Sequence, residues 1–420
     1  MAILYKKIIL AGLLIFFISC DGARAPVQSA AYPGLEAAED PKKEVPLRQV
    51  ATDSAFIRAL ENYFEEAINT GQIIGAGVTI VHKEGLIYQG GFGKRKASAS
   101  SEIDENTIFR IGSLSKGFAG ILGATLVDDG KLSWEDLIYE RIPEFQLSDS
   151  LHTQRVRLAH ILSHSSGMPY HTYTNLVEAN LSLATIAKQL KEVKNLQPIG
   201  EIFSYQNAVF ALSGTYYEAV TNQDMSTLLA EKLFKPLGMK DASASHQAMK
   251  EAKNIAYPHK GGDGNWWTQK LNQKYYNAIA AGGINASASD MGKWLYLLLG
   301  QRPDVVTKQS LEAVLSPQIA SKDHYRYYSK WPGHNTSYYG FGWRMHTFDT
   351  PSGQDTLVHH GGYVNGYRSE IAVSQAADLG ICVLFNSSNA LSRTCVPDIL
   401  ALYEKFNNAG VIPPDTLAID

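Results

Sequence analysis

The sequence predicts an α/β fold of the α+β type, in which an antiparallel sheet flanked by helices is built from both chain ends and carries an inserted, mainly helical lobe. Three observations support this prediction. "GAGVTIVHKEGLIYQGGFG" (75–93) predicts two strands around a turn at Glu84-Gly85. "YGFGWRM", "TLVHH", "YRSEIAV" and "GICVLFN" predict further strands in the last third of the chain, and residues 113–284 are mostly helical in pattern. This order is neither alternating βαβ nor all-β.

Apolar periodicity locates the helices. One helix is expected to open near Asp53 and to stop at Gly71, because Phe56, Leu60 and Phe64 recur on one face. The other clear helical patterns cover residues 118–126, 181–190, 208–220, 226–233 and 397–406.

Composition excludes several classes of protein. The chain has 420 residues, 45% of them apolar and 19% charged, with a net charge of −3. This is a globular balance, and the length calls for one large domain or two lobes. The absence of a long basic run argues against a nucleic-acid partner. No segment after the N-terminus reaches the roughly 18 apolar residues of a membrane span.

The N-terminus predicts a secretory signal. Lys6 and Lys7 precede an apolar run over residues 8–18, which is short for a membrane span. "FISC" ends in Cys20 and resembles a lipoprotein signal with Cys20 lipidated, whereas "ARA" (23–25) fits ordinary cleavage, which would remove Cys20. We expect a signal over 1–20, a proline-containing tether over 21–50, and a hydrolase domain over 51–410. That domain divides into an α/β lobe (51–112 plus 285–410) and a helical lobe (113–284).

Two cysteines remain in the body of the chain, Cys382 and Cys395. An exported protein could join them in a disulfide, but the sequence does not give their separation in space. Two buried free thiols are the preferred prediction.

"IFRIGSLSKGF" (108–118) holds the only Ser-x-x-Lys of the chain, Ser113 and Lys116. On a helix these positions share a face, so the lysine can reach back to the serine hydroxyl. A helix N-terminus favours developing negative charge, and a desolvated lysine can lose its proton and activate a serine. Chance alone would give a pattern this short about once or twice, and the alternative is an ordinary helix start. Gly112 and the apolar run after Phe118 favour the catalytic interpretation.

"PIGEIFSYQNAVFALSG" (198–214) places Tyr205 and Asn207 two residues apart, so both can point the same way in an extended segment. A lysine nearby could lower the pKa of the tyrosine enough for it to shuttle a proton. Asn207 could bind a substrate amide or hold Lys116. Tyr-x-Asn also occurs at Tyr173, Tyr275 and Tyr363, where surface or turn chemistry is the expected role.

"LVHHGGYVNGYRSEI" (357–371) predicts a strand that ends in a flat, glycine-rich edge where a substrate backbone could add on. The N–H of Tyr363 could pair with that of Ser113 as an oxyanion hole. Two registers are open, His359-His360-Gly361 or His360-Gly361-Gly362.

Seven motifs in order then carry a family resemblance. They are "FRIGSLSKGF", "VRLAHILSHSSGMPY", "GEIFSYQNAVFALSG", "KPLGMKDAS", "AAGGINASASDMGKWL", "YGFGWRM" and "HHGGYVNGYRS". Over roughly residues 55–405 the chain resembles the serine β-lactamase and penicillin-binding-protein superfamily, in the branch of class C β-lactamases, DD-peptidases, D-aminopeptidases and related esterases. The resemblance implies a β-lactamase/transpeptidase-like fold. It also implies Ser113 as acylated nucleophile, Lys116 as its proton partner, Tyr205 as general base and acid, and Asn207 on the substrate amide. His360 and Gly362 would then be the ends of the third family motif.

One departure changes the expected substrate. β-Lactamases and DD-carboxypeptidases of this branch usually carry Lys-Thr-Gly where this chain has His360-Gly361-Gly362. Histidine is mostly neutral at pH 7, so recognition of a substrate carboxylate by this residue is in doubt. Relatives with histidine here include esterases and D-aminopeptidases, which favours a peptidase or an esterase. A class C-like β-lactamase remains an alternative, and so does a non-catalytic penicillin- or peptidoglycan-binding sensor module.

Three other features have a structural interpretation beside a functional one. His160 and His164 have metal-ligand spacing but lack the glutamate of a zinc-protease motif, so a structural loop is expected. Trp266-Trp267 could wall a cleft or anchor a loop. The tyrosines of "HYRYYSKW" (Tyr325, Tyr327 and Tyr328) could form a lid, although a solvated loop is the safer prediction.

The sequence therefore predicts an exported serine hydrolase that needs no cofactor or metal and acts on an amide or ester bond. Its expected partner is a small-molecule or peptide substrate, which could be derived from the cell wall. Contact with a membrane is expected only through the lipid on Cys20. The expected location is the periplasmic side of a bacterial membrane, or the periplasm or medium if Cys20 is not lipidated.

Overall fold

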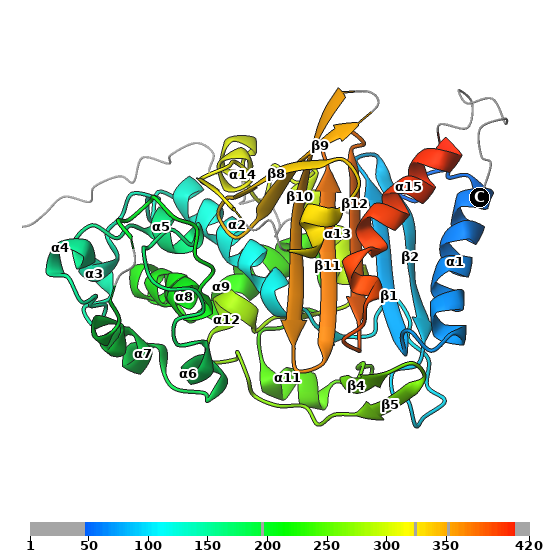
Figure 1. Ribbon diagram of the computed structural model, residues 1–420, viewed down its shortest axis with the longest axis horizontal. Coiled ribbons are helices and arrows are strands. Elements are labelled where there is room, and N and C mark those ends of the chain that lie inside the picture. The colour runs from blue at the N-terminus through cyan, green and yellow to red at the C-terminus, as the bar shows by residue number, and fades with distance from the viewer. Residues whose placement is uncertain (1–46, 195–196, 323–325, 351–352, 408–420) are drawn as a thin grey trace, which may run out of the picture. The chain divides into compact units, whose positions relative to one another are not determined.

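Eight antiparallel strands form one sheet at the centre of the molecule, in the order β2-β1-β12-β11-β10-β9-β8-β7 (Figure 1). The computed structural model describes residues 47–194, 197–322, 326–350 and 353–407, which belong to one compact unit. The strands are β1 (Gly75–His82), β2 (Gly85–Gly93), β7 (Ile319–Ala320), β8 (His334–Tyr339), β9 (Arg344–Thr350), β10 (Gly353–Val364), β11 (Tyr367–Ser374) and β12 (Leu379–Phe385).

The two ends of the domain meet inside this sheet. Strand β1 pairs with β12 from Ala76 opposite Phe385 to His82 opposite Leu379, so the early hairpin extends the late strands. The prediction of an antiparallel sheet completed by both chain ends is confirmed. The turn that joins β1 to β2 is Lys83-Glu84, one residue before the predicted Glu84-Gly85, because Gly85 already begins β2.

Helices α1 (Ser54–Asn69) and α15 (Cys395–Asn407) lie side by side on one face of the sheet (Figure 1). The Asp53 carboxylate caps α1 by accepting from the Ala55 N–H at 2.7 Å, as expected of a helix N-terminus. The aromatic face of α1 is fully buried against apolar residues of β1, β12 and α15. Burial of this face holds the helix on the sheet.

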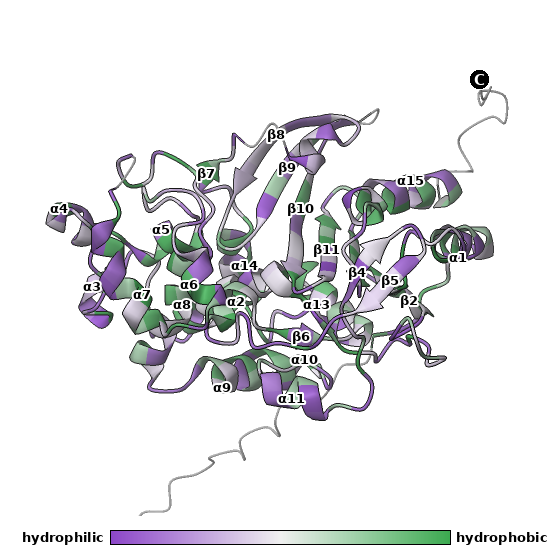
Figure 2. Cartoon of the chain, turned by 60° about the horizontal axis from the view of Figure 1, so that its bottom comes forward, coloured by the Kyte–Doolittle hydropathy of each residue, from purple (hydrophilic) through white to green (hydrophobic). Residues whose placement is uncertain are grey.

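The other face carries α2 (Ser115–Asp128) and α13 (Ala288–Leu298), with α8 (Asn207–Thr221) and α12 (Ile279–Gly282) beyond. Most of α2 is buried, and most of its residues are apolar, as expected of a helix inside a core; Lys116 is the buried exception that could carry a charge (Figure 2). The remaining helices are α3 (Ile138–Arg141), α4 (Ser150–Thr153), α5 (Leu158–Leu162), α6 (Thr174–Glu178), α7 (Leu183–Gln189), α9 (Met225–Leu229), α10 (Lys235–Leu237), α11 (His246–Glu251) and α14 (Lys308–Val314).

Three features differ from the sequence prediction. A hairpin of β4 (His259–Gly262) and β5 (Asn265–Thr268) interrupts the segment predicted as helical, and the helix expected over 226–233 is α9 followed by a π-helical stretch over 230–234. The last residues of the predicted tether are part of the fold, because Gln49 bridges to Leu86 of β2. The two-residue strands β3 (Phe109–Arg110) and β6 (Asn285–Ala286) pair on either side of the helical segment.

Both Cys382 on β12 and Cys395 at the start of α15 are buried and unbonded. The prediction of two free thiols is confirmed. Burial raises the pKa of each thiol well above its ordinary value, so both stay protonated.

The predicted signal, with Cys20, lies outside the described residues, as does most of the predicted tether. Within the part of the chain that the structure describes, no helix is both long and apolar enough to cross a membrane.

Candidate active site

Ser113 lies in a short 3₁₀ turn, η1 (Gly112–Leu114), that leads directly into α2. Gly112 has φ +54°, and a Cβ there would lie 2.8 Å from the backbone N of Tyr363. Only glycine combines this left-handed backbone with so close an approach. The turn therefore sets Ser113 against the end of β10, half-buried at the edge of a cleft.

Lys116 is fully buried one turn further along, on the same face as Ser113, as its spacing predicts. Its Nζ donates to Asn207 Oδ1 at 2.7 Å and to the Ala281 carbonyl at 2.9 Å. Burial, and secondarily the positive charge of Arg344, lowers the pKa of Lys116 well below its ordinary value. A neutral amine has two N–H donors and one lone pair, so the two bonds leave the lone pair to accept a proton.

Tyr205 also lies at this point and lines the cleft together with Ser113. Lys116 Nζ is 4.7 Å from the centroid of the Tyr205 ring. Burial nevertheless raises the pKa of Tyr205 to about 12, although Ser113 and the charge of Arg344 lower it. The expectation of a lowered tyrosine pKa was wrong, because burial disfavours the charged phenolate more than the neighbouring groups stabilise it.

Asn207 opens α8 and holds Lys116 rather than lining the cleft. Its Oδ1 accepts from Lys116, and its Nδ2 donates to the hydroxyl of Tyr275 at 3.1 Å. Of the two roles considered for Asn207, the structure shows the contact with lysine. Tyr275 was expected to have only a surface or turn role. It is instead buried, and its hydroxyl takes part in this network. Its backbone is left-handed (φ +69°).

The end of β10 provides a second wall of the site. β10 pairs with β9 only as far as His359, so the edge from His360 onward is open on that side. Val364 pairs with Tyr367 across a two-residue turn, and Tyr363 pairs with Arg368 as the next pair. In such a hairpin the second pair is not hydrogen-bonded, so the Tyr363 N–H points away from β11, toward Gly112.

His360 is buried beside this edge and is neutral. Its Nδ1 lies 2.9 Å from the Gly361 carbonyl and its Nε2 3.0 Å from the Tyr339 hydroxyl. Because a carbonyl only accepts, we assign the proton to Nδ1, and Nε2 accepts from Tyr339. Burial, and secondarily the charge of Arg344, lowers the pKa of His360 well below its ordinary value.

The two candidate registers, His359-His360-Gly361 and His360-Gly361-Gly362, share His360 and Gly361. Both of these residues line the cleft. Gly362 has another role, since a Cβ there would lie 2.2 Å from the Ile111 carbonyl oxygen. Gly362 thus allows β10 to approach the turn that carries Ser113. The sequence predicted that Gly362 binds substrate, but it is not among the described residues that line the cleft. Tyr363 brings its backbone to that turn, while its side chain is 53% exposed.

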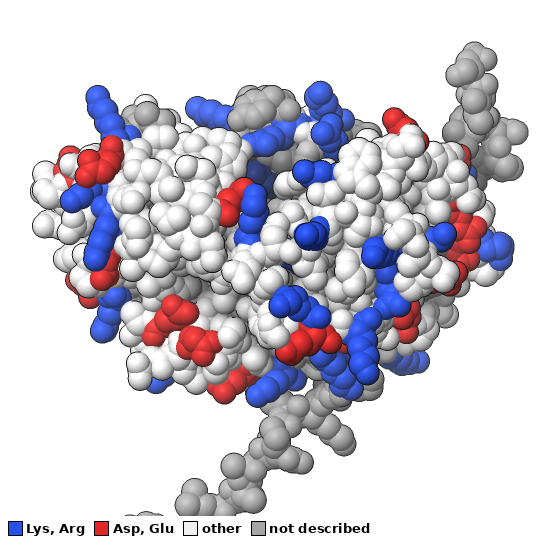
Figure 3. Space-filling view, turned by 90° about the horizontal axis from the view of Figure 1, so that it is seen from below, with Lys and Arg blue, Asp and Glu red and all other residues white. Residues whose placement is uncertain are grey.

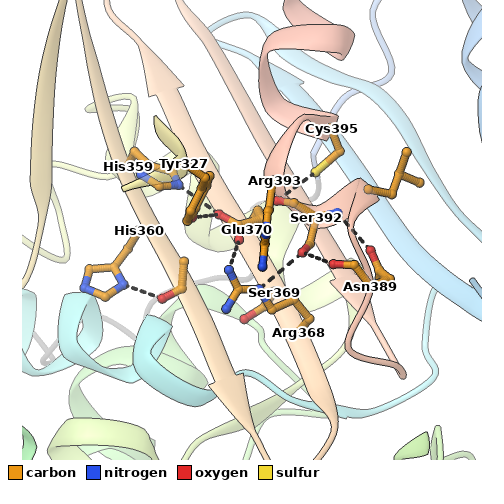
Figure 4. A network of polar contacts seen from close by, with 12 residues as sticks. Tyr327, His359, His360, Arg368, Ser369, Glu370, Asn389, Ser392, Arg393 and Cys395 are labelled. Carbon is orange, nitrogen blue, oxygen red and sulfur yellow. Dashed lines mark hydrogen bonds and ion pairs between the residues drawn. The ribbon is translucent and has the colours of Figure 1, made fainter. Parts of the chain in front are cut away.

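Behind the cleft lies a buried polar network that the sequence analysis did not identify (Figure 4). The Glu370 carboxylate accepts from Tyr327 at 2.8 Å and lies 2.9 Å from His359 Nε2. His359 Nδ1 in turn lies 3.1 Å from His346 Nε2. A carboxylate and two histidines among apolar strand residues are the signal that could have revealed it, because such groups are buried only when paired.

The cleft has a volume of about 780 Å³ and is open to solvent. Its described lining comprises Ser113, Tyr170, His171, Tyr205, Arg326, Tyr327, Tyr328, Lys330, Trp331, Arg344, His360, Gly361, Tyr363, Arg368, Arg393 and Thr394. Tyr327 and Tyr328 thus wall the cleft, and the safer prediction of a solvated loop was wrong for both. Tyr325 lies outside the described residues.

The remaining candidates have structural roles. His160 caps α5 by accepting from the Arg157 N–H at 3.0 Å, and His164 accepts from the Gln206 N–H at 3.2 Å. Each imidazole ring thus stabilises the local backbone by accepting a hydrogen bond from it. This is the structural role that the sequence predicts for the segment. Trp266 anchors the β4-β5 hairpin through a 3.0 Å bond from its Nε1 to the Gly71 carbonyl.

Comparison with known proteins identifies the family. Residues 60–402 match the family described as Beta-lactamase. The chain therefore belongs to the Beta-lactamase family, as its ordered motifs suggested. Fold, sheet order and the position of Ser113 before a buried helix are consistent with this membership.

Two relatives illustrate the range of the match. Unguisins hydrolase ungD of Aspergillus violaceofuscus is 24% identical over 346 residues, which make up 77% of this chain and 60% of that protein. Protein flp of Staphylococcus aureus is 21% identical over 332 residues, 78% of this chain and 62% of that protein. The chain thus spans about three fifths of the length of these curated relatives.

Solved structures share the fold. The octameric penicillin-binding protein homologue from Pyrococcus abyssi superposes with a TM-score of 0.70 at 24% identity, covering 83% of this chain and 79% of that one. EstCE1, a hydrolase with promiscuous acyltransferase activity, gives 0.69 at 17% identity, covering 84% and 99%.

Proposed function

We propose that the protein is an exported serine hydrolase that forms an acyl-enzyme at Ser113 and cleaves an amide or ester bond. The observation that carries this proposal is the buried Lys116, which donates to Asn207 and Ala281 and lies 4.7 Å from the centroid of the Tyr205 ring, in the cleft that Tyr205 lines with Ser113. A lysine costs free energy to bury, so its burial next to a nucleophile calls for a functional reason.

The first chemical step is attack by Ser113 on a carbonyl carbon. The hydroxyl proton of Ser113 passes to Tyr205 as the phenolic proton of Tyr205 passes to the lone pair of Lys116. This relay suits a tyrosine with a pKa of about 12, because the phenol never has to exist as a free phenolate. The same groups return a proton to the leaving amine or alcohol, and water then releases the acyl group.

The carbonyl oxygen becomes negatively charged in this step. The N–H groups of Ser113 and Tyr363 are its proposed partners, because Tyr363 presents its N–H on the open edge of β10 toward the turn of Ser113. Each such donor contributes about 3 kcal/mol to transition-state stabilisation.

His360 supports a peptidase or an esterase over a β-lactamase. It is neutral and bonded to Tyr339, so it offers no positive charge where β-lactamases of this branch carry lysine. The relative unguisins hydrolase and the structural neighbour EstCE1, a hydrolase with promiscuous acyltransferase activity, are both named as hydrolases.

Comparing three substrates tests the proposal. Hydrolysis of a D-residue peptide, a p-nitrophenyl ester and a penicillin would be followed with the full chain and with Ser113→Ala. We expect turnover of the peptide or the ester that is lost in Ser113→Ala. Penicillin as the best substrate would mean a β-lactamase, and acylation without turnover of any substrate would mean a binding or sensor module.

A further inference from the structure

Two histidines with a left-handed backbone contact the segment that carries Tyr205. His164 has φ +59° and His171 has φ +57°, and both lie in the loop that follows α5. A residue other than glycine adopts this conformation at a cost in free energy, which the surrounding structure must offset. His164 is only 1% exposed, so packing holds its backbone in this conformation.

His164 binds the peptide groups on both sides of Tyr205. Its carbonyl accepts from the Ser204 N–H at 2.8 Å, and its Nδ1 accepts from the Gln206 N–H at 3.2 Å. The carbonyl of Tyr205 itself accepts from the His171 N–H at 2.9 Å. One short loop thus holds the backbone at three successive residues around the proposed proton carrier.

The ring of His164 also packs on the ring of Tyr205, with centroids 4.3 Å apart and planes at 41°. The rings of Tyr339 and Phe210 lie 4.9 Å and 5.1 Å from the same imidazole. Close packing of this kind leaves a ring little room to shift. The contacts therefore hold the Tyr205 side chain at the cleft, whose wall it forms together with Ser113.

The tautomer of His164 follows from its bond to the backbone. Because the Gln206 N–H can only donate, Nδ1 carries the lone pair and Nε2 the proton. Burial, with the charge of Arg344 as a lesser cause, lowers the pKa of His164 well below its ordinary value, so the ring stays neutral. Figure 3 shows basic side chains gathered at the hollow in the upper part of the view, as expected of a cleft lined by Arg344 and other cations.

His164 does not have the properties of a residue that serves stability alone. Its backbone is in an unfavourable conformation. Its Nε2 is buried and has no hydrogen-bond partner among the residues that the structure describes. A buried donor without an acceptor costs free energy. Strain of this kind is typical of functional sites, where it fixes the geometry of a reacting group.

We infer that His164 is a positioning residue for Tyr205: by holding the backbone on both sides of it, the histidine keeps the phenol within reach of Ser113 and Lys116. This inference rests on the proposed function, in which Tyr205 carries the proton. It adds a consequence for acylation to the local stabilisation that the same hydrogen bonds provide.

Two substitutions test the bond to Gln206. His164→Gly removes the ring and suits the left-handed backbone, whereas His164→Asn keeps an acceptor at the position of Nδ1 and tolerates the same backbone. We expect fluorophosphonate labelling of Ser113 to slow by about tenfold or more in His164→Gly, because a small misplacement of a reacting group is enough for such a loss. His164→Asn should label within a few-fold of wild type.

The matched control is His160→Ala, which removes another histidine whose Nδ1 accepts a backbone N–H, that of Arg157 at 3.0 Å. It should lower the temperature of thermal unfolding without slowing labelling. Wild-type labelling in His164→Gly, or labelling as slow in His164→Asn as in His164→Gly, would overturn the inference. If His164→Gly does not fold, His164→Gln, which lacks an acceptor at the δ position, takes its place.

A double substitution shows whether His164 acts through Tyr205. In the Tyr205→Phe background no phenol is left to position, so adding His164→Gly should slow labelling by no more than about twofold. A further tenfold loss in this background would mean that His164 affects labelling by another route, which overturns the inference.

Amide hydrogen exchange, followed by mass spectrometry on the full chain, decides the inference without any activity. Exchange of the peptide that covers residues 204–206 should be faster in His164→Gly than in wild type, and unchanged in His164→Asn and His160→Ala. Unchanged exchange in His164→Gly overturns the positioning inference and leaves the hydrolase standing. Absence of any adduct at Ser113 of the wild-type chain overturns the hydrolase, and the exchange rates still decide whether His164 holds this segment.

Discussion

At the scale of single residues, the site depends on two groups whose pKa values are moved in opposite directions by burial. Burial disfavours the charged form, so it lowers the pKa of Lys116 and raises that of Tyr205 to about 12. Burial thus favours the neutral form of both groups. A neutral amine and a neutral phenol can pass a proton without a separated charge pair in the resting site.

Replacing Tyr205 by phenylalanine removes the phenol and keeps the ring. We expect acylation of Ser113 to slow by about a hundredfold or more, because the hydroxyl proton loses its route to Lys116. The measurement is the rate of labelling by a fluorophosphonate. Tyr216→Phe is the control, because it removes a phenol of α8 that donates to Asp136 at 3.1 Å and is not part of the described cleft lining. Labelling of Tyr205→Phe within a few-fold of wild type would leave Tyr205 a structural residue.

The pH dependence of labelling tests the state of Lys116. Protonated Lys116 cannot accept a proton, so the rate should fall as pH drops through its pKa and stay level above it. Because burial lowers that pKa, the level region should begin well below the ordinary lysine value of about 10.4. Labelling rates from acid to alkaline pH, corrected for loss of the reagent, give the midpoint. A midpoint near the ordinary value would contradict a neutral lysine.

The sequence could predict the residues of this site but not their environment. Ser113, Lys116 and Tyr205 were identified from spacing and resemblance, and the structure brings them together. The direction of the Tyr205 pKa and the part played by Tyr275 were missed, because both depend on burial by distant segments. Tyr275 and Asn207 are 68 residues apart in the chain.

At the scale of elements, the turn before α2 and the end of β10 must approach within van der Waals contact. Gly112 and Gly362 make this possible, because a Cβ on either would overlap the backbone of the other element. The approach brings the backbone of Tyr363 to the turn that carries Ser113. The packing of these two elements would therefore set the geometry of the proposed oxyanion site.

Gly112→Ala should therefore impair both stability and acylation. Its left-handed backbone (φ +54°) costs alanine about 1–2 kcal/mol, and the added Cβ would push Tyr363 away. Gly130→Ala is a close control, because Gly130 has φ +66° and nothing within 4 Å of its Cβ position. Thermal unfolding should show a loss in both variants, whereas slower labelling is expected only in Gly112→Ala. Equal labelling rates in the two variants would refute the role given to this contact.

Local patterns predicted most elements and failed where pairing is non-local. Amphipathic or apolar periodicity located α1, α2, α8 and α15 to within a few residues. The β4-β5 hairpin was missed because its short strands, "HKGG" and "NWWT", are rich in glycine and polar residues and show no clear alternation. The two-residue strands β3 and β6 depend on contact between segments about 175 residues apart.

At the scale of the whole molecule, the topology assembles functions that no segment shows alone. The strands at both chain ends share one sheet, and β10, at its centre, meets the helix that carries Ser113 and Lys116. The cationic lining of the cleft is a product of the same topology. Its arginines are spread along the chain from Arg326 to Arg393, so no local sequence pattern predicts that they share one cleft.

Export as a lipoprotein is a proposal at this scale, and it concerns residues outside those described. Cys20→Ser should release the protein from the membrane fraction of a bacterial host, because acyl chains on Cys20 would be its anchor. Fractionation followed by immunoblotting measures this. Ala25→Asp, which disrupts the competing "ARA" site, should leave the protein in the membrane fraction. Retention of Cys20→Ser there would count against lipidation.

Intact-protein mass spectrometry after incubation with a fluorophosphonate tests the central claim most directly, that Ser113 is the nucleophile. The account predicts one adduct on the wild-type chain and on Ser100→Ala, an exposed-serine control, and none on Ser113→Ala. A penicillin in a parallel sample would show whether a β-lactam is also accepted. An adduct that persists in Ser113→Ala, or no adduct on the wild-type chain from either reagent, would contradict the account.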